Sequence, residues 1–224
     1  MPSDEIDIPS GLILEPMVLG LELRRVEDPP GQGVRAELAA IRRGSHPLAR
    51  AIRGVEGPVI DATTGLGGDT AVLASLGREV FAIERNPVLA RMLQDAHERL
   101  DDRAQADRIH LHRGDACRIL AEAEDPFTHP AAIVLDPMYP TRRSASALPT
   151  KPMQLLRELR AGHTTSDDTE NLIACAFATR ARRVVLKRPP EALPPDSRGK
   201  PTFSIESKLV RWDVWERGQS SVMP

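Results

Sequence analysis

Three carboxylic acids stand where apolar stretches of the chain end. Asp61, Glu84 and Asp136 each directly follow a short run of apolar residues that is typical of a buried strand. In an open α/β sheet, ligands bind at the carboxyl ends of the parallel strands. We therefore expect the three acids to lie together at one ligand-binding edge.

The first acid opens a glycine-rich turn with the sequence Asp61-Ala62-Thr63-Thr64-Gly65-Leu66-Gly67-Gly68-Asp69. Glycines allow the backbone to turn tightly and to approach a ligand closely. Glu84 follows at roughly the 20-residue spacing of an acid that binds ribose hydroxyls. The alternative is an ordinary strand-to-helix turn. The turn residues that we expect to contact a nucleoside cofactor are Asp61, Gly65, Gly67, Gly68 and Asp69.

The turn also indicates which nucleoside is bound. A dinucleotide fingerprint needs a third glycine, which is missing here. Asp69 stands at the start of the following helix, where it would repel a pyrophosphate. A cofactor with a ribose, no phosphate and a cationic group fits better, and S-adenosylmethionine has these properties.

A second chemical motif is the loop Asp136-Pro137-Met138-Tyr139-Pro140. Its two prolines exclude a regular strand or helix, so the chain must turn at the ligand edge. A planar base can stack on Tyr139, while its exocyclic amine donates to Asp136 and to a backbone carbonyl of the Pro137 turn. Otherwise Asp136 only caps and Tyr139 only packs. We predict that Asp136, Pro137 and Tyr139 are catalytic, and that Asp136 also borders the cofactor.

Asp115 and Ala116 follow a third predicted strand, at residues 109–112. Asp115 is therefore placed to accept the adenine amino group, or to cap the next helix, and the two roles are compatible. His110 and His112 in that strand lack supporting metal ligands, so we expect no metal site.

Basic residues are expected near the same edge. They suit contacts with RNA phosphates, although a solvated loop is the alternative. The net charge of −2 gives no global signal for nucleic acid, so such contacts require a local patch. The basic residues assigned to the substrate RNA are Arg142, Arg143, Lys151, Lys187 and Arg188.

Composition favours a cytoplasmic protein. The acidic N-terminus does not resemble a signal peptide, and no apolar run reaches membrane-spanning length. Cys117 and Cys175 are the two cysteines, and we expect both to be reduced. The oligomeric state is not predicted.

The elements divide the chain into two parts. Residues 1–50 form a β-rich appendage and connector, in which alternating stretches at 19–23 and 34–38 flank a turn at 29–33 and predict a hairpin. Residues 51–224 contain five β-α-like units and then two alternating stretches, 203–207 and 210–215, whose short connection requires an antiparallel pair. This pattern predicts a Rossmann-like, mostly parallel seven-stranded sheet with a C-terminal antiparallel strand.

These motifs together resemble the RsmJ-type small-subunit ribosomal RNA guanine-N2 methyltransferases, which are class I enzymes. The resemblance covers roughly residues 20–215. The matching pieces are Leu21-Glu22-Leu23-Arg24, the turn 61–69, Leu73-Ala74-Ser75-Leu76-Gly77, Glu84-Arg85-Asn86-Pro87, Leu135-Asp136-Pro137-Met138-Tyr139-Pro140 and Val184-Val185-Leu186-Lys187-Arg188-Pro189.

The resemblance implies S-adenosylmethionine contacts at Gly68-Asp69, Glu84-Arg85, Asp115-Ala116 and Asp136. It also implies a small ribosomal subunit, or its RNA, as substrate. The chain departs from the family in a shorter N-terminus, in the stretch Arg42–Pro47, where the family is basic and glycine-rich, and in Asp115-Ala116, where small hydroxyl residues are common.

The expected reaction is in-line transfer of the sulfonium methyl group to an exocyclic amine. A methyltransferase acting on adenine or on a small planar amine fits the same loop. A non-catalytic ribosome-assembly factor that kept the fold is a further alternative. An NAD-dependent dehydrogenase is disfavoured by the missing third glycine and by the lack of an acid–base histidine near the ligand edge.

Overall fold

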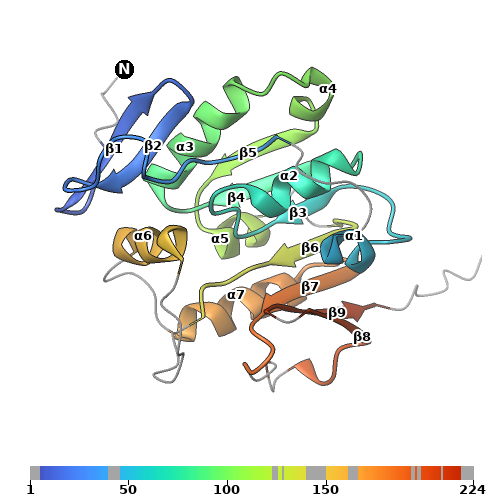
Figure 1. Cartoon of the computed structure of the whole chain (residues 1–224). Coiled ribbons are helices and arrows are strands. Elements are labelled where there is room, and N and C mark those ends of the chain that lie inside the picture. Colours follow the sequence, from blue (N-terminus) through green and yellow to red (C-terminus); the bar gives the residue numbers. More distant parts are fainter. Residues whose placement is uncertain are drawn as a thin grey trace, which may run out of the picture.

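The computed structural model describes residues 6–39, 46–122, 126–127, 129–139, 150–160, 166–192, 195, 198–207 and 209–217. Figure 1 shows an open central sheet with helices on both sides and a separate two-stranded hairpin near the N-terminus. Strands and helices alternate along most of the chain. The predicted α/β class is therefore confirmed.

The central sheet has seven strands in the order β5-β4-β3-β6-β7-β9-β8. The first five of these are parallel, and β9 pairs antiparallel with both β7 and β8. This arrangement confirms a mostly parallel sheet with a C-terminal antiparallel strand, β9, which lies between β7 and the edge strand β8. The strands are β3 (Val59–Asp61), β4 (Val80–Glu84), β5 (Ile109–Arg113), β6 (Ala132–Leu135), β7 (Arg183–Arg188), β8 (Phe203–Glu206) and β9 (Arg211–Glu216).

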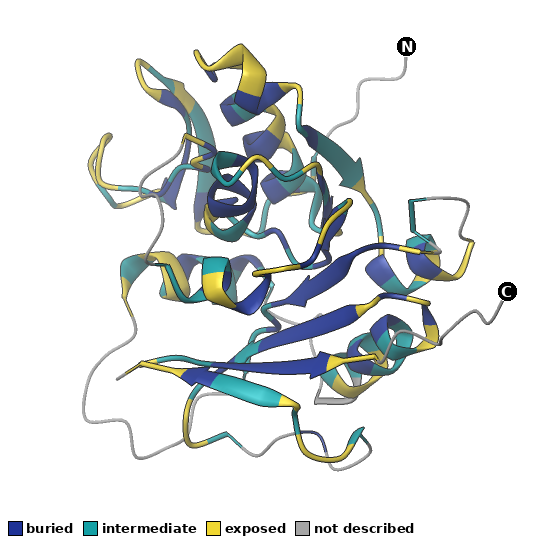
Figure 2. Cartoon of the chain, turned by 90° about the vertical axis from the view of Figure 1, so that its right-hand side faces the viewer, coloured by how far each residue is buried: buried dark blue, intermediate teal, exposed yellow. Residues whose placement is uncertain are grey.

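Alternation along the strands divides the interior into two cores. Val59 belongs to one core and its neighbour Ile60 to the other, because successive side chains point to opposite faces of a sheet. The first core includes residues of α1 (Pro47–Ala51), α2 (Gly68–Ser75), α3 (Pro87–Glu98), α4 (Arg103–Ala106) and α6 (Lys151–Leu159). The second includes residues of α5 (Ala116–Ala121) and α7 (Ser166–Ala178). Figure 2 shows the central strands as buried.

The N-terminal hairpin differs from the prediction. It joins β1 (Leu12–Met17) to β2 (Gly20–Arg25), and the stretch 34–38 is not a strand. Only Val34 pairs, in an isolated bridge with Leu23. The reason is burial: Val34, Ala36 and Leu38 lie in the first core, so their alternation reflects packing and not a ladder.

The hairpin lies against the helices beside the sheet. The Leu21 backbone N–H donates to Asp95 of α3 at 3.0 Å, and Arg25 forms an ion pair with Glu158 of α6 at 2.5 Å. These contacts place the hairpin next to α6, which borders the candidate site.

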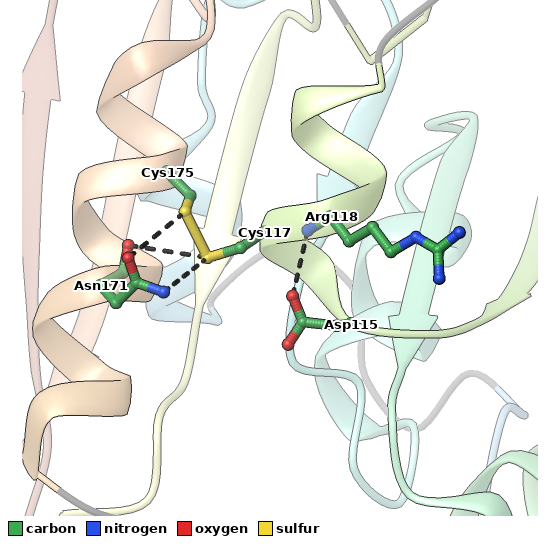
Figure 3. The surroundings of a disulfide bond; sticks show 5 residues. All are labelled: Asp115, Cys117, Arg118, Asn171 and Cys175. Atoms are coloured by element: carbon green, nitrogen blue, oxygen red, sulfur yellow. Dashed lines mark hydrogen bonds between the residues drawn. A yellow bond between two sulfur atoms is a disulfide. The ribbon is translucent and has the colours of Figure 1, made fainter.

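The expectation of two reduced cysteines is wrong for this structure. Cys117 of α5 and Cys175 of α7 form a disulfide with a Cα–Cα distance of 5.3 Å (Figure 3). The residues are 58 positions apart in sequence. Their contact depends on the packing of α5 against α7, which residue spacing does not encode.

In the described part of the chain, no helix is long and apolar enough to span a membrane. Among the same residues, no group of three histidine, cysteine, aspartate or glutamate side chains is placed to hold a metal ion.

Candidate active site

The glycine-rich turn connects β3 to α2 through backbone conformations that favour glycine. Gly65 and Gly67 have positive φ angles of 58° and 92°. A Cβ on Gly67 would lie 2.7 Å from Cδ2 of Leu38, so this position has no room for a side chain. The turn is therefore packed tightly against the first core on its inner side.

Asp61, at the end of β3, supports this turn through hydrogen bonds. Its carboxylate accepts hydrogen bonds from the Thr70 hydroxyl at 2.6 Å and from the Thr63 backbone N–H at 3.2 Å. Burial raises the pKa of Asp61 to about 7, and the negative charge of Asp69 adds to this shift. Asp61 is only 2% exposed and borders neither pocket described below. The structure thus shows it supporting the turn, and a direct contact with the cofactor stays a prediction.

Glu84 ties the turn to the end of β4. Its two carboxylate oxygens accept from the Gly65 and Asn86 backbone N–H groups, each at 2.8 Å. Arg160, which follows α6, lies 3.8 Å from the same carboxylate. Glu84 is 3% exposed and lines the first pocket, so it remains placed to accept further hydrogen bonds through its free lone pairs.

The first pocket is a cavity of about 80 Å³ at the ends of β3, β4 and β5. Asp115 caps α5 by accepting from the Arg118 backbone N–H at 3.0 Å, and Arg85 lies 3.6 Å from Asp168 of α7. The capping role of Asp115 is thus confirmed. The pocket brings together the predicted residues Glu84, Arg85, Asp115 and Ala116, together with Pro137.

The second pocket is an open cavity of about 790 Å³ on the other side of the Asp136 loop. It combines charged side chains with an apolar wall. Met153 and Leu156 of α6 contribute to this wall, as do Leu209 and Val210, which directly precede β9. Its lining also contains the predicted residues Gly65, Gly68, Asp69, Asp136, Pro137, Tyr139, Lys187 and Arg188.

Four residues line both pockets: Thr63, Pro137, Met138 and Arg160. Thr63 anchors the shared wall, because its hydroxyl oxygen accepts from the Asp136 backbone N–H at 2.6 Å. The two pockets therefore meet where the Asp136 loop contacts the glycine-rich turn. Sequence reasoning missed Thr63 and Arg160. Thr63 lies inside the glycine-rich motif, whereas no local pattern marks Arg160.

Asp136 forms an ion pair with Lys187 at 2.7 Å, and the same Lys187 Nζ lies 3.0 Å from Asp69. Burial raises the pKa of Asp136, Lys187 opposes this shift, and Asp69 adds to it. Burial lowers the pKa of Lys187, but Asp136 and Asp69 together raise it above its ordinary value. The lysine is therefore a charged bridge between the two acids.

Tyr139 lies half-buried in the second pocket, three residues along the loop from Asp136. Burial raises its pKa, partly opposed by Arg188, so the phenol is neutral at physiological pH. A neutral ring at the pocket wall is suited to stacking on a planar ligand.

The predicted phosphate-binding residues have different environments. The Arg188 side chain is 4% exposed and donates to Asp213 at 2.7 Å, so it is unavailable to an RNA phosphate. Lys187 is engaged by two carboxylates, and Lys151 pairs with Asp28 at 3.0 Å. Arg142 and Arg143 lie outside the described residues, as does Pro140.

The side chains at this edge fit S-adenosylmethionine. Acids predominate near the turn, which suits a cation and disfavours a pyrophosphate. A Cβ built on Gly68 would meet no atom within 4 Å, so the backbone borders open space there, on the wall of the second pocket. The predicted cofactor residues that line one of the two pockets are Gly65, Gly68, Asp69, Glu84, Arg85, Asp115, Ala116 and Asp136.

Comparison with known proteins assigns the chain to a family. Residues 32–217 match the family model described as "Putative SAM-dependent methyltransferase". The chain is 39% identical over 226 residues to Ribosomal RNA small subunit methyltransferase J of Halorhodospira halophila, covering 92% of this chain and 81% of the relative. The same-named protein of Thioalkalivibrio sulfidiphilus is 45% identical over 187 residues, covering 80% and 71%.

A solved structure agrees with this assignment. The SAM-dependent methyltransferase NGO1261 from Neisseria gonorrhoeae superposes with a TM-score of 0.70 at 30% identity, covering 92% of this chain and 83% of that one. The fold and site thus define a class I S-adenosylmethionine-dependent methyltransferase. Within that class, the chain belongs to the family that contains the Ribosomal RNA small subunit methyltransferase J proteins.

Proposed function

We propose that this enzyme methylates the exocyclic N2 amine of a guanine in small-subunit ribosomal RNA. The observation that carries the proposal is the Asp136-Pro137-Met138-Tyr139 loop, which forms part of the wall between the two pockets. In this arrangement the first pocket takes the nucleoside part of the cofactor and the second takes the acceptor base. S-adenosylmethionine supplies an activated methyl group when it is bound.

The chain's contribution is to orient the acceptor amine. An aryl amine is a poor nucleophile because its lone pair is delocalised into the ring. Hydrogen bonds from the amine to Asp136 and to a backbone carbonyl of the Pro137 turn bring the lone pair out of conjugation. Thr63 fixes the start of the loop through the Asp136 N–H, so the acceptors are preorganised.

The second pocket suits a base that has left its stack. Tyr139 offers a ring for stacking, and the Met153 side of α6 offers an apolar wall. A flipped-out or single-stranded nucleotide is the expected substrate form. Arg142 and Arg143 follow the loop in sequence and are proposed to hold RNA phosphates, together with Lys151.

The substrate class rests on the relatives reported above, which are named as small-subunit ribosomal RNA methyltransferases. Guanine N2 is the finer part of the proposal and follows from the resemblance of the motifs. The proposed partner is the small ribosomal subunit or its RNA, and the proposed location is the cytoplasm.

The test is transfer of a tritiated methyl group from S-adenosylmethionine. The acceptors are small ribosomal subunits and naked small-subunit RNA, both from a strain that lacks this gene. Label in RNA is expected, and the better acceptor shows whether the enzyme acts before or after assembly. No label in either acceptor, with the cofactor still bound, would contradict the proposal and favour another planar amine or a binding role.

A further inference from the structure

Lys187 occupies a position that phosphate binding does not explain. It lies near the carboxyl end of β7, with Nζ 2.7 Å from Asp136 Oδ2 and 3.0 Å from Asp69 Oδ2. Nζ also lies 5.1 Å from the centre of the Trp212 ring, and Trp212 is 2% exposed. The ammonium group is therefore held by two carboxylates and an aromatic face, and its side chain is 24% exposed.

The contact with Asp136 is selective for one oxygen. Lys187 donates to Oδ2 of Asp136, while the backbone N–H of the same residue donates to Thr63. The Asp136 side chain is 40% exposed, and the residue lines the second pocket. A carboxylate fixed at its backbone and at Oδ2 has Oδ1 left to accept from a ligand.

Other charged groups surround Asp136. Two acids, Asp69 of α2 and Asp61 at the end of β3, interact electrostatically with Asp136. Arg160, which follows α6, contributes a positive charge. Tyr139 lies on the same loop. His46, before α1, faces Asp69 and Lys187, and burial lowers its pKa. Of these groups, Lys187 is the only one for which a direct ion pair with Asp136 is described.

We propose that Lys187 is a positioning residue, which keeps Asp136 ionised and directs its free oxygen toward the acceptor amine. Ionisation matters because a carboxylate only accepts hydrogen bonds, whereas a protonated acid also donates. This inference rests on the proposed function, since it assumes that Asp136 accepts from the amine. It adds a role for a residue that sequence reasoning assigned to RNA.

The sign of the effect follows from the surrounding charges. Burial and Asp69 raise the pKa of Asp136, and Lys187 lowers it. Without the lysine charge, Asp136 would therefore take up a proton at a higher pH. Without the Asp69 charge, the pKa of Asp136 would fall, and Asp136 would take up a proton at a lower pH. A residue with a merely structural role would not produce this pair of opposite shifts.

The experiment measures kcat against pH at saturating S-adenosylmethionine and RNA for the wild type, Lys187→Gln, Lys187→Arg and Asp69→Asn. The kcat profile reports ionisations in the enzyme–substrate complex. We expect the acid limb of Lys187→Gln to move at least about one pH unit upward, which lowers kcat about tenfold along that limb. Lys187→Arg should keep the wild-type limb, and Asp69→Asn should move it downward.

Two controls separate the possible failures. Lys200→Gln removes one positive charge from an exposed site and should leave the profile unchanged. Calorimetric binding of S-adenosylhomocysteine by Lys187→Gln tests folding and the cofactor site independently of turnover. If Lys187→Gln fails to bind S-adenosylhomocysteine, the pH profiles of Asp69→Asn and Lys187→Arg still test the direction in which the acid limb moves.

An unchanged acid limb in Lys187→Gln, or shifts of the same sign in Lys187→Gln and Asp69→Asn, would overturn the role of Lys187. That result leaves the proposed function standing, because the wild type still methylates RNA. If the wild type transfers no methyl group to RNA, the proposed function itself fails, and with it the assumption about Asp136.

Discussion

The two pockets share a wall and differ in how they are built. The first is small and is formed by strand ends whose acids are already hydrogen-bonded to the backbone, as Glu84 is to Gly65 and Asn86. The second is about ten times larger and combines an apolar wall with the Asp69–Lys187–Asp136 bridge. Under the proposed function, the smaller pocket takes the nucleoside part of the cofactor and the wider one takes a base of the RNA.

The largest effect that separates the pockets is expected at Asp136. Asp136→Ala removes the proposed acceptor of the amine, and loss of one preorganised polar contact typically lowers the rate on the order of 10²–10³-fold. Binding of S-adenosylhomocysteine should change less than turnover does, because Asp136 lines the second pocket and not the first. Single-turnover transfer and calorimetry measure the two quantities. Wild-type turnover in this variant would disprove the mechanism.

Glu84 should show the reverse pattern, with an effect on cofactor affinity and little effect on kcat. Glu84→Ala removes a carboxylate that organises the first pocket, and a hydrogen bond to a charged group contributes about 1.5–3 kcal/mol, or roughly 10–150-fold in affinity. We expect weaker S-adenosylhomocysteine binding with kcat largely kept at saturating cofactor. Glu84→Gln is the matched control and should lose less affinity. A fall in kcat without a change in the affinity for S-adenosylhomocysteine would contradict the assignment of the first pocket to the cofactor.

The disulfide lies beside the first pocket, since Cys117 is one of its lining residues. Its loss should lower the free energy of unfolding by about 2–4 kcal/mol, because the cross-link restricts the unfolded chain. Urea unfolding of Cys175→Ser against the wild type, each with and without a reductant, measures this. The reductant should affect only the wild type. Alkylation of two free thiols in the untreated protein would show that the bond is absent.

Asp61 supports the turn that both pockets share, and its expected effect is a dependence of stability on pH. The pKa of Asp61 is raised from 3.8 to about 7 in the folded protein. Between these values the folded state holds a proton that the unfolded state has released, so stability falls as pH rises, by at most about 1.4 kcal/mol per pH unit. Asp61→Asn should show a shallower decline of the melting temperature over this range. An equally steep decline would place the buried proton elsewhere.

The main features of the fold could be predicted because each has a local signal. The acids at strand ends, the glycine turn and the Asn86-Pro87 helix start are set by neighbouring residues, and the structure shows Asn86 capping α3 at 2.9 Å from the Val88 N–H. The prediction of a strand at residues 34–38 was wrong, because alternation of apolar and polar residues also arises when a segment packs on a core without pairing with another strand.

The environment of each charge could not be predicted in the same way. Lys187 and Arg188 are adjacent in sequence and similar in chemistry, yet one bridges two acids beside the loop and the other pairs with Asp213 in β9. Their partners are more than 20 residues away along the chain. The disulfide could not be predicted for the same reason, since it depends on the packing of α5 against α7.

The measurement that tests the central claim most directly is nucleoside mass spectrometry of small-subunit RNA after reaction with the wild-type enzyme and S-adenosylmethionine. The RNA comes from a strain that lacks this gene. We predict the appearance of N2-methylguanosine, which identifies the exocyclic amine that the Asp136 loop presents. A methyl group on a ring nitrogen, a carbon or a ribose hydroxyl would contradict the assignment, because none of these acceptors offers an exocyclic amine to Asp136.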